Sequence, residues 1–320
     1  MKLYSKASVT APLAAMSESG RFVHSYIITG PKGAGKKTAA VYTAMMLLCS
    51  DVHDGMPCGV CRDCRRVMKN EHPDFIIVER SKKSYSVDDM RRIVTDAYVS
   101  PNDCDRKVYL LADCGGWSDA AQAAMLKITE DPPDPVYFIF TAESLSDFLP
   151  TLISRSMPSE VSPADRESCI AALSERFPDR DEAELAGAAA AFCGNIGKCI
   201  EYLDGNEKLM KNVARVRELS RAAASGSEYT ALRVLSEVKD RDDLKELLGM
   251  FAAVIRDAAA QKAGSDVRIS CDAGGAAMMA SISAQRLTDM YDEVMKISYA
   301  CGLNVNTDAA AAVLAGKMTV

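Results

Sequence analysis

The chain has 320 residues, 48% hydrophobic and 26% charged, and at about 100–200 residues a domain this length predicts two or three domains of a soluble globular protein. No apolar run approaches the roughly 18–20 residues of a bilayer span, and Tyr26–Gly30 is too short for a secretory segment, so membrane and secreted classes are excluded and a cytoplasmic protein is expected. The net charge of −6 excludes nucleic-acid binding through bulk charge and leaves only a local patch for it.

The first predicted strand, at 26–29, leads into the segment 30–36 (GPKGAGK), and a helix is expected from Lys36 to about Leu48. A Gly-x4-Gly-Lys segment between a strand and a helix is typical of a phosphate-binding loop, or P-loop. Its glycines let backbone amides turn toward phosphate oxygens, and the helix N-terminus adds positive potential. A plain glycine turn that opens a helix is the alternative. The candidate nucleotide-binding residues are Gly30, Gly33, Gly35 and Lys36.

The P-loop differs from an active one at the position after Lys36. That position should carry Ser or Thr, whose hydroxyl holds Mg²⁺. Here it is Lys37, whose ammonium repels a metal ion, and Thr38 lies about 100° further round the helix. This difference argues against magnesium-dependent hydrolysis by the chain and leaves open whether ATP or ADP binds to the loop.

Four of the eleven cysteines fall within sixteen residues, in an insertion at 49–69. Four thiolates at this spacing fit a tetrahedral Zn²⁺, and a site closed by four thiolates is structural rather than catalytic. An iron–sulfur cluster would need a further cysteine where Met68 stands, whereas redox-active or unliganded thiols remain alternatives. His53 and His72 are interpreted as polar loop residues, not ligands. The expected zinc ligands are Cys49, Cys58, Cys61 and Cys64.

Further strands are predicted at 75–78, 107–111 and 136–141, with helices at 87–98 and 118–129. This alternation predicts a doubly wound parallel sheet. An active P-loop enzyme also needs two acids after a later strand, but the segment 112–114 (ADC) offers one, Asp113. Either Ala112 stands where the first acid is needed, or Cys114 stands where the second is needed. This missing acid, like Lys37, argues against magnesium-dependent ATP hydrolysis by the chain alone.

After Ser154-Arg155 no further strand is expected. A helix should start after 162–165, longer helices are expected at 208–224 and 228–263, and the pattern breaks at 264–268 and 272–275. The predicted architecture is an α/β domain at 1–158, a small helical domain at 159–205 and a C-terminal helical domain at 206–320.

Several collinear motifs resemble bacterial clamp-loader subunits of the AAA+ class. They are the P-loop, the Cys-x8-Cys-x2-Cys-x2-Cys spacing and the segment 72–74 (HPD). Residues 123–133 (AAMLKITEDPP) look like the family's NALLKTLEEPP, and 149–155 (LPTLISR) look like its LPTILSR, normally followed by Cys where this chain has Ser156. The resemblance covers about residues 10–205. It implies an AAA+ domain with a zinc module, a helical lid domain and a helical collar domain for oligomerisation.

Within that family the chain is similar to the delta-prime group and not to the gamma/tau ATPases. The ATPases keep Ser or Thr after the P-loop lysine, an Asp-Glu pair on the strand and a sensing arginine where this chain has Gly197. The resemblance implies a non-hydrolysing part of the DNA polymerase III holoenzyme that supports ATP-dependent loading of the sliding clamp onto primed DNA. Its implied partners are the gamma/tau and delta subunits. The alternatives are an active gamma/tau-like ATPase that uses Thr38 and Asp113, and a zinc-dependent interaction module with an inherited P-loop.

The resemblance also gives a role to Arg155, which follows Ser154 in the family's Ser-Arg motif. An arginine presented at a subunit boundary stabilises the negative charge that develops on a neighbour's γ-phosphate. Arg155 is therefore the expected catalytic residue, acting in trans as an arginine finger. A salt bridge in the subunit interface is the alternative.

Overall fold

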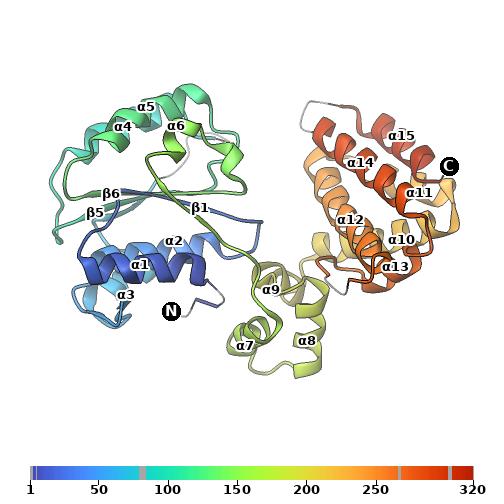
Figure 1. Cartoon of the computed structure of the whole chain (residues 1–320), viewed down its shortest axis with the longest axis horizontal. Helices are drawn as coiled ribbons and strands as arrows, with labels where there is room; N and C mark the ends of the chain where they lie inside the picture. Colours follow the sequence, from blue (N-terminus) through green and yellow to red (C-terminus); the bar gives the residue numbers. More distant parts are fainter. Residues whose placement is uncertain (1–2, 5, 79–83, 266–267, 302–304, 320) are drawn as a thin grey trace. The chain divides into compact units, whose positions relative to one another are not determined.

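The computed structural model describes residues 3–4, 6–78, 84–265, 268–301 and 305–319 (Figure 1). The chain divides into two compact units, Met1–Ala164 and Asp165–Val320. The first is an α/β unit and the second is helical throughout its described residues, which confirms the predicted order of fold classes. The finer domain limits expected at 158 and 205 remain predictions.

The first unit is built on a parallel sheet with the strand order β4-β5-β6-β1-β7. All four expected strands are present, and residues of the central strands β1, β5 and β6 are buried throughout, as strands covered on both faces should be. The strands are β1 (Ser25–Thr29), β4 (Phe75–Ile77), β5 (Lys107–Leu111), β6 (Val136–Ala142) and β7 (Met157–Glu160).

Helices cover both faces of this sheet (Figure 1). Because successive strand residues point to opposite faces, Ile28 and Ile139 pack with α1 and α2, whereas Ile27 and Phe140 belong to the core beneath α4 and α5. One layer contains α1 (Ala7–Ser19), α2 (Lys36–Leu48) and α3 (Arg62–Met68), and the other contains α4 (Val87–Ala97), α5 (Asp119–Glu130) and α6 (Pro150–Ile153).

The expectation that strands stop at Arg155 is wrong, because β7 follows directly. Its sequence, MPSE, lacks the apolar run that marks a covered strand. β7 pairs with β1 alone, at the edge of the sheet, where Pro158 leaves no ladder hydrogen bond unmade. An edge strand needs little apolar character, so its pattern gave no signal.

The insertion at 49–69 forms a short hairpin of β2 (Val52–His53) and β3 (Met56–Pro57), followed by α3. Its only long apolar anchor among the buried residues of α3 is Val67, which lies in the core cluster of α2. At the hairpin turn, a Cβ on Gly55 would lie 2.6 Å from the Cβ of Ala14 in α1. The insertion is therefore packed against the helical layer.

The second unit contains helices from α7 to α15. The single helix expected at 228–263 is wrong: α11 ends at Ser236 and α12 starts after Asp240, whose carboxylate accepts the Asp243 N–H at 3.0 Å as an N-cap. Their bounds are α7 (Arg166–Arg176), α8 (Glu182–Ala191), α9 (Ile196–Leu203), α10 (Glu207–Ser225), α11 (Glu228–Ser236), α12 (Arg241–Lys262), α13 (Ala273–Met279), α14 (Ala284–Cys301) and α15 (Thr307–Thr319).

The break expected at 272–275 is also wrong in part, since Asp272 caps α13 and the next residues are helical. Of the break expected at 264–268, Gly264 follows α12 in the left-handed region with φ +81°, and residues 266–267 lie outside the described residues. Among the helices that the structure describes, none combines the length and apolar character needed to cross a membrane.

Candidate functional site

The P-loop connects the carboxyl end of β1 to the first turn of α2. Gly30, Gly33 and Gly35 have φ values of +148°, +84° and +93°, which other residues rarely adopt. Lys36 is the first residue of α2 and is 8% exposed. Its Nζ donates to the carbonyl oxygens of Gly30 at 2.8 Å and Pro31 at 3.2 Å. The structure thus brings the four predicted loop residues together and folds the lysine back onto its own loop.

The carboxylates of three acidic residues after strands β5 and β6 act electrostatically on the lysine. Burial lowers the pKa of Lys36, and the carboxylates of Glu143, Asp113 and Asp147 oppose that shift. Asp113 follows β5 and Glu143 follows β6, so both lie at the carboxyl edge of the sheet, where ligands of parallel sheets bind. Glu143 was missed in the sequence because an acid after a strand carries no motif of its own.

The positions that should hold Mg²⁺ carry the wrong groups. Lys37 and Thr38 are both exposed on the first turn of α2. After β5, Cys114 is buried and its Sγ lies 3.3 Å from the Leu111 carbonyl oxygen, so it supplies no carboxylate and faces the core. Asp113 has φ +54° and donates its N–H to Thr141 Oγ1 at 3.0 Å. The segment after β5 therefore presents one acid, as predicted.

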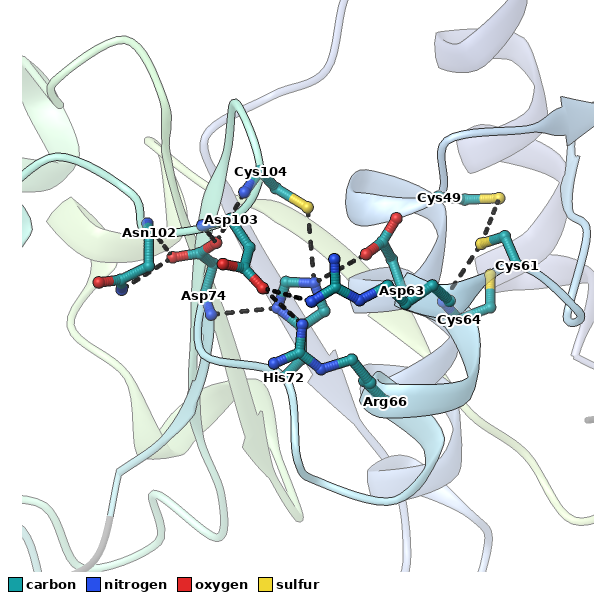
Figure 2. Close-up of polar contacts among 11 residues, drawn as sticks. Cys49, Cys61, Asp63, Cys64, Arg66, His72, Asp74, Asn102, Asp103 and Cys104 are labelled. Carbon is teal, nitrogen blue, oxygen red and sulfur yellow. Dashed lines mark hydrogen bonds and ion pairs between the residues drawn. The ribbon is translucent and has the colours of Figure 1, made fainter.

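The four predicted cysteine ligands lie together, with all four sulfur atoms within 4.8 Å of one another. Cys49 caps the end of α2 and Cys61 caps the start of α3 (Figure 2). The Sγ of Cys49 is 3.6 Å from that of Cys58 and 4.0 Å from that of Cys61, far beyond a disulfide bond. Four sulfurs bound at about 2.3 Å around a tetrahedral Zn²⁺ lie about 3.8 Å apart, so the spacing fits that ion.

Backbone amides point at the sulfur atoms of this cluster. Cys58 N–H donates to Cys49 Sγ at 3.4 Å, and Cys64 N–H donates to Cys61 Sγ at 3.3 Å. Burial acts to raise the pKa of Cys61, but hydrogen bonds from Cys64 and Ser50 outweigh it and lower that pKa to about 6. Burial raises the pKa of Cys49. Amides that donate to sulfur stabilise thiolates, the form in which cysteine binds a metal.

A second cluster joins α3 to the start of β4 and contains Asp63, His72 and Cys104 (Figure 2). His72 lies in a loop, as expected, and its side chain is buried. Its Nδ1 accepts the Asp74 N–H at 3.1 Å, so the ring proton lies on Nε2, which is 3.5 Å from both Asp63 Oδ1 and Cys104 Sγ. Burial and nearby acids raise the pKa of Cys104 to about 11. The Nε2 proton of His72 therefore lies between the Asp63 carboxylate and the Cys104 sulfur, as in a hydrogen-bonded contact.

Asp74 fixes the loop between α4 and β5 against this cluster. Its fully buried carboxylate accepts N–H groups from Asn102 at 2.6 Å, Asp103 at 2.8 Å and Cys104 at 2.9 Å. Asp103 in turn pairs with Arg66 of α3 at 2.5 Å. Burial acts to raise the pKa of Asp74, and the backbone amides outweigh it and lower the pKa. The only local sign of this network was the His-Pro-Asp segment.

Arg155 lies in the turn between α6 and β7. Its Nη1 donates to the Thr151 carbonyl oxygen at 2.8 Å, and its Nη2 lies 3.1 Å from Glu130 Oε1. β7 runs parallel to β1 with Met157 opposite Tyr26 and Glu160 opposite Thr29. Arg155 therefore precedes the amino end of β7, whereas the P-loop follows the carboxyl end of β1, more than about 10 Å further along the strands. The structure does not bring Arg155 to the chain's own P-loop.

Comparisons with known proteins agree with these features. The family model described as DNA polymerase III, delta subunit, matches residues 5–165. The chain is 34% identical over 149 residues to the DNA polymerase III subunit gamma/tau of Mycobacterium tuberculosis, a match that covers 46% of this chain and 26% of that protein. It therefore spans about a quarter of the length of the mycobacterial relatives.

A second relative matches along most of both chains. The DNA polymerase III subunit delta' of Escherichia coli is 25% identical over 289 residues, 89% of this chain and 85% of that one. Among solved structures, a DNA polymerase III gamma subunit-related protein from Thermotoga maritima aligns with a TM-score of 0.51 at 15% identity, covering 97% of this chain and 98% of that one, and this likeness concerns the fold alone. The resemblance seen in the sequence motifs is confirmed.

Proposed function

The chain belongs to the family of the DNA polymerase III delta subunit, and from this premise we propose that it serves in DNA replication as a non-hydrolysing, delta-prime type subunit of the clamp loader. In this role it assembles with gamma/tau ATPase subunits and a delta subunit, and it meets the sliding clamp and primed DNA through that complex. Its catalytic contribution is Arg155, which acts on the nucleotide of a neighbouring ATPase subunit.

The loss of the chain's own ATPase is supported by the P-loop. Lys37 places an ammonium where Mg²⁺ needs a hydroxyl, and either Ala112 or Cys114, whose thiol is buried in the core, stands where an acid is needed beside Asp113. Gly197, at the position of the family's sensing arginine, lies in α9 and has no side chain to offer. Lys36 is held by two carbonyl oxygens of its own loop.

The observation that carries the proposal is the place of Arg155. Its position at the amino end of β7, away from the P-loop at the carboxyl end of β1, supports a role toward a nucleotide on another chain rather than toward the chain's own loop. Its side chain is about one-third exposed, so it is within reach of a partner. An arginine fits this task because its planar fork of donors matches the oxygens of a phosphate and stays charged at any physiological pH.

The four cysteines are proposed to hold one structural Zn²⁺. Their sulfur spacing and the amide hydrogen bonds to them support this assignment. The ion would fix the hairpin and α3 as one module, and the chain's own chemistry does not pass through it. ATP or ADP is not assigned to the P-loop.

The proposal is tested in a clamp loader reassembled from purified subunits. The isolated chain should release no phosphate from ATP. Arg155→Ala should lower the DNA-stimulated ATPase rate of the loader about tenfold or more, towards the ~10³-fold that arginine fingers supply, and Arg155→Lys should restore only a part because lysine lacks the fork. An unchanged rate with Arg155→Ala would remove the role assigned to this residue.

One observation favours a second candidate, an active gamma/tau-like ATPase subunit. The chain is 34% identical to a gamma/tau subunit over 149 residues and 25% identical to a delta' subunit over 289 residues, and the carboxylates of Asp113 and Glu143 both act on Lys36. This candidate predicts steady ATP turnover by the isolated chain that is lost on Lys36→Ala.

A further inference from the structure

Arg155 carries a long side chain whose rotatable bonds leave its guanidinium many positions in solution. Two contacts restrict it: Nη1 donates to the Thr151 carbonyl oxygen at 2.8 Å, and Nη2 pairs with Glu130 Oε1 at 3.1 Å. The first contact comes from the same turn as the arginine and moves with it. The second comes from α5, so among the described residues Glu130 is the one that holds the guanidinium relative to an element outside α6 and this turn.

The backbone around Arg155 is fixed on both sides. The Arg155 N–H donates to the Leu152 carbonyl oxygen at 3.2 Å, which closes the end of α6. Ser156 Oγ lies 2.7 Å from Ser25 Oγ at the start of β1, and Met157 pairs with Tyr26. The two residues that follow Arg155 are therefore fixed to the sheet. The remaining freedom is in the side chain.

Glu130 is the last residue of α5, and a buried amide fixes α5 relative to the entry of α6. The side chain of Gln122 is 2% exposed; its Nε2 donates to the Asp147 carbonyl oxygen at 3.0 Å, and its Oε1 accepts the Leu149 N–H at 2.7 Å. Leu149 is the N-cap of α6. Because Gln122 and Glu130 share one helix, the backbone of Glu130 is held relative to the turn that carries Arg155.

From this geometry we propose that Glu130 is a positioning residue for Arg155, holding the guanidinium in the orientation in which it meets the neighbouring subunit's nucleotide. The inference rests on the proposed function of Arg155. Of the five N–H donors of a guanidinium, the contacts with Thr151 and Glu130 use two, so further donors remain for phosphate oxygens. The Glu130 carboxylate therefore orients the guanidinium and leaves its remaining N–H donors free for phosphate oxygens.

The exposure of the pair favours positioning over restraint. The side chains of Glu130 and Arg155 are 63% and 32% exposed, and ion pairs this open to water are weak. A weak pair can bias the rotamers of an arginine in the absence of a partner. It cannot keep a guanidinium from a polyphosphate, which offers several charge-assisted hydrogen bonds.

The test compares Glu130→Ala and Glu130→Gln in the reassembled clamp loader. Glu130→Ala should lower kcat of the DNA-stimulated ATPase about 3- to 10-fold, because a misplaced catalytic group loses rate, and it should leave KM for ATP unchanged. Glu130→Gln should recover more than half of that loss, since its amide oxygen still accepts from the guanidinium. Glu184→Ala breaks a comparable exposed pair with Arg180, at 2.6 Å, and should change nothing.

Arg155→Ala, assayed in parallel, separates this inference from the function on which it rests. If Arg155→Ala lowers the rate and Glu130→Ala does not, Glu130 has no positioning role. If either Glu130 variant raises the rate, the carboxylate restrains the arginine and the inference is overturned. If Arg155→Ala itself has no effect, the proposed function fails first. Equal melting temperatures of wild type and Glu130→Gln establish that a change in kcat is not a loss of folded subunit.

Discussion

Gly30 shows how one residue of the P-loop serves the fold whether or not a nucleotide binds. Its φ is +148°, and a Cβ at this position would lie 2.2 Å from the carbonyl oxygen of Val161. The two segments lie this close because Val161 N–H donates to the Thr29 carbonyl oxygen at 2.7 Å, just beyond the pairing of β7 with β1. A glycine here is required by the approach of two backbones.

Replacing this glycine should therefore destabilise the protein by two separate effects. Gly30→Ala is expected to lower the free energy of unfolding by about 3 kcal/mol, from the strained backbone and from overpacking against Val161. The matched control is Gly20→Ala, where φ is +67° but no atom lies within 4 Å of the added Cβ, so only about 1 kcal/mol should be lost. Urea denaturation measures both, and equal losses would show that the contact with Val161 carries no cost.

Asp74 is a residue whose charge stabilises the fold, and its substitution tests that directly. Asp74→Asn should lower the free energy of unfolding at pH 7 by on the order of 3 kcal/mol, since a buried amide is a poorer acceptor for the amides of Asn102, Asp103 and Cys104. The pKa of Asp74 in the folded chain is lowered, so its contribution is complete above the unfolded value near 4 and is lost as pH falls below it. Denaturant titrations should show a constant difference between wild type and variant from pH 5 to 8, narrowing below about pH 4. A difference that widens in acid would refute this assignment.

At the scale of elements, the strands that lie inside the sheet could be predicted and the one at its edge could not. β5 and β6 are apolar along their length because both faces are covered, and that pattern is visible in the sequence. β7 depends on β1 for its hydrogen bonds and carries Pro158. Similarly, the interruption between α11 and α12 depends on a cap at Asp240, within a stretch whose helical propensity is continuous.

The difference between local sequence patterns and contacts made only in the folded chain also explains which residues of the candidate sites could be predicted. The P-loop and the four cysteines are local motifs, so their residues could be named from spacing alone. Gln122, Glu130 and Asp74 act through partners 25 to 30 positions away, such as Leu149, Arg155 and Cys104, and no local pattern marks such pairs. Their roles depend on the folded sheet.

The zinc assignment can be tested through the metal content and the hydrogen exchange of the module formed by the β2–β3 hairpin and α3. Protein purified without added metal should contain about one equivalent of zinc by elemental analysis, and Cys61→Ser should lose it. Hydrogen exchange should then increase at 49–69 while the strands of the sheet stay protected, because their core lies elsewhere. Cys104→Ser is the control and should retain the metal, since Cys104 contacts His72 and not the four-cysteine cluster. Global unfolding of Cys61→Ser, or wild-type protein with less than half an equivalent, would contradict the assignment.

At the scale of the molecule, the α/β unit has the framework of a P-loop domain, and under the proposed function it has lost groups that perform hydrolysis. Its sheet, its glycine loop and its covering helices are complete, and each has a role in packing. The groups that differ from those of an active P-loop ATPase are few: Lys37 on α2 and either Ala112 or Cys114 after β5 in this unit, and Gly197 in α9 of the second unit. Arg155 stands at the opposite end of the strands from that loop.

The central claim is that this chain contributes an arginine to a neighbour's ATPase and no hydrolysis of its own. The most direct measurement is the DNA-stimulated phosphate release of a reassembled clamp loader carrying either Lys36→Ala or Arg155→Ala in this subunit. The account predicts that the rate falls about tenfold or more with Arg155→Ala and is unchanged with Lys36→Ala. A loss of rate with Lys36→Ala, together with a normal rate for Arg155→Ala, would contradict it.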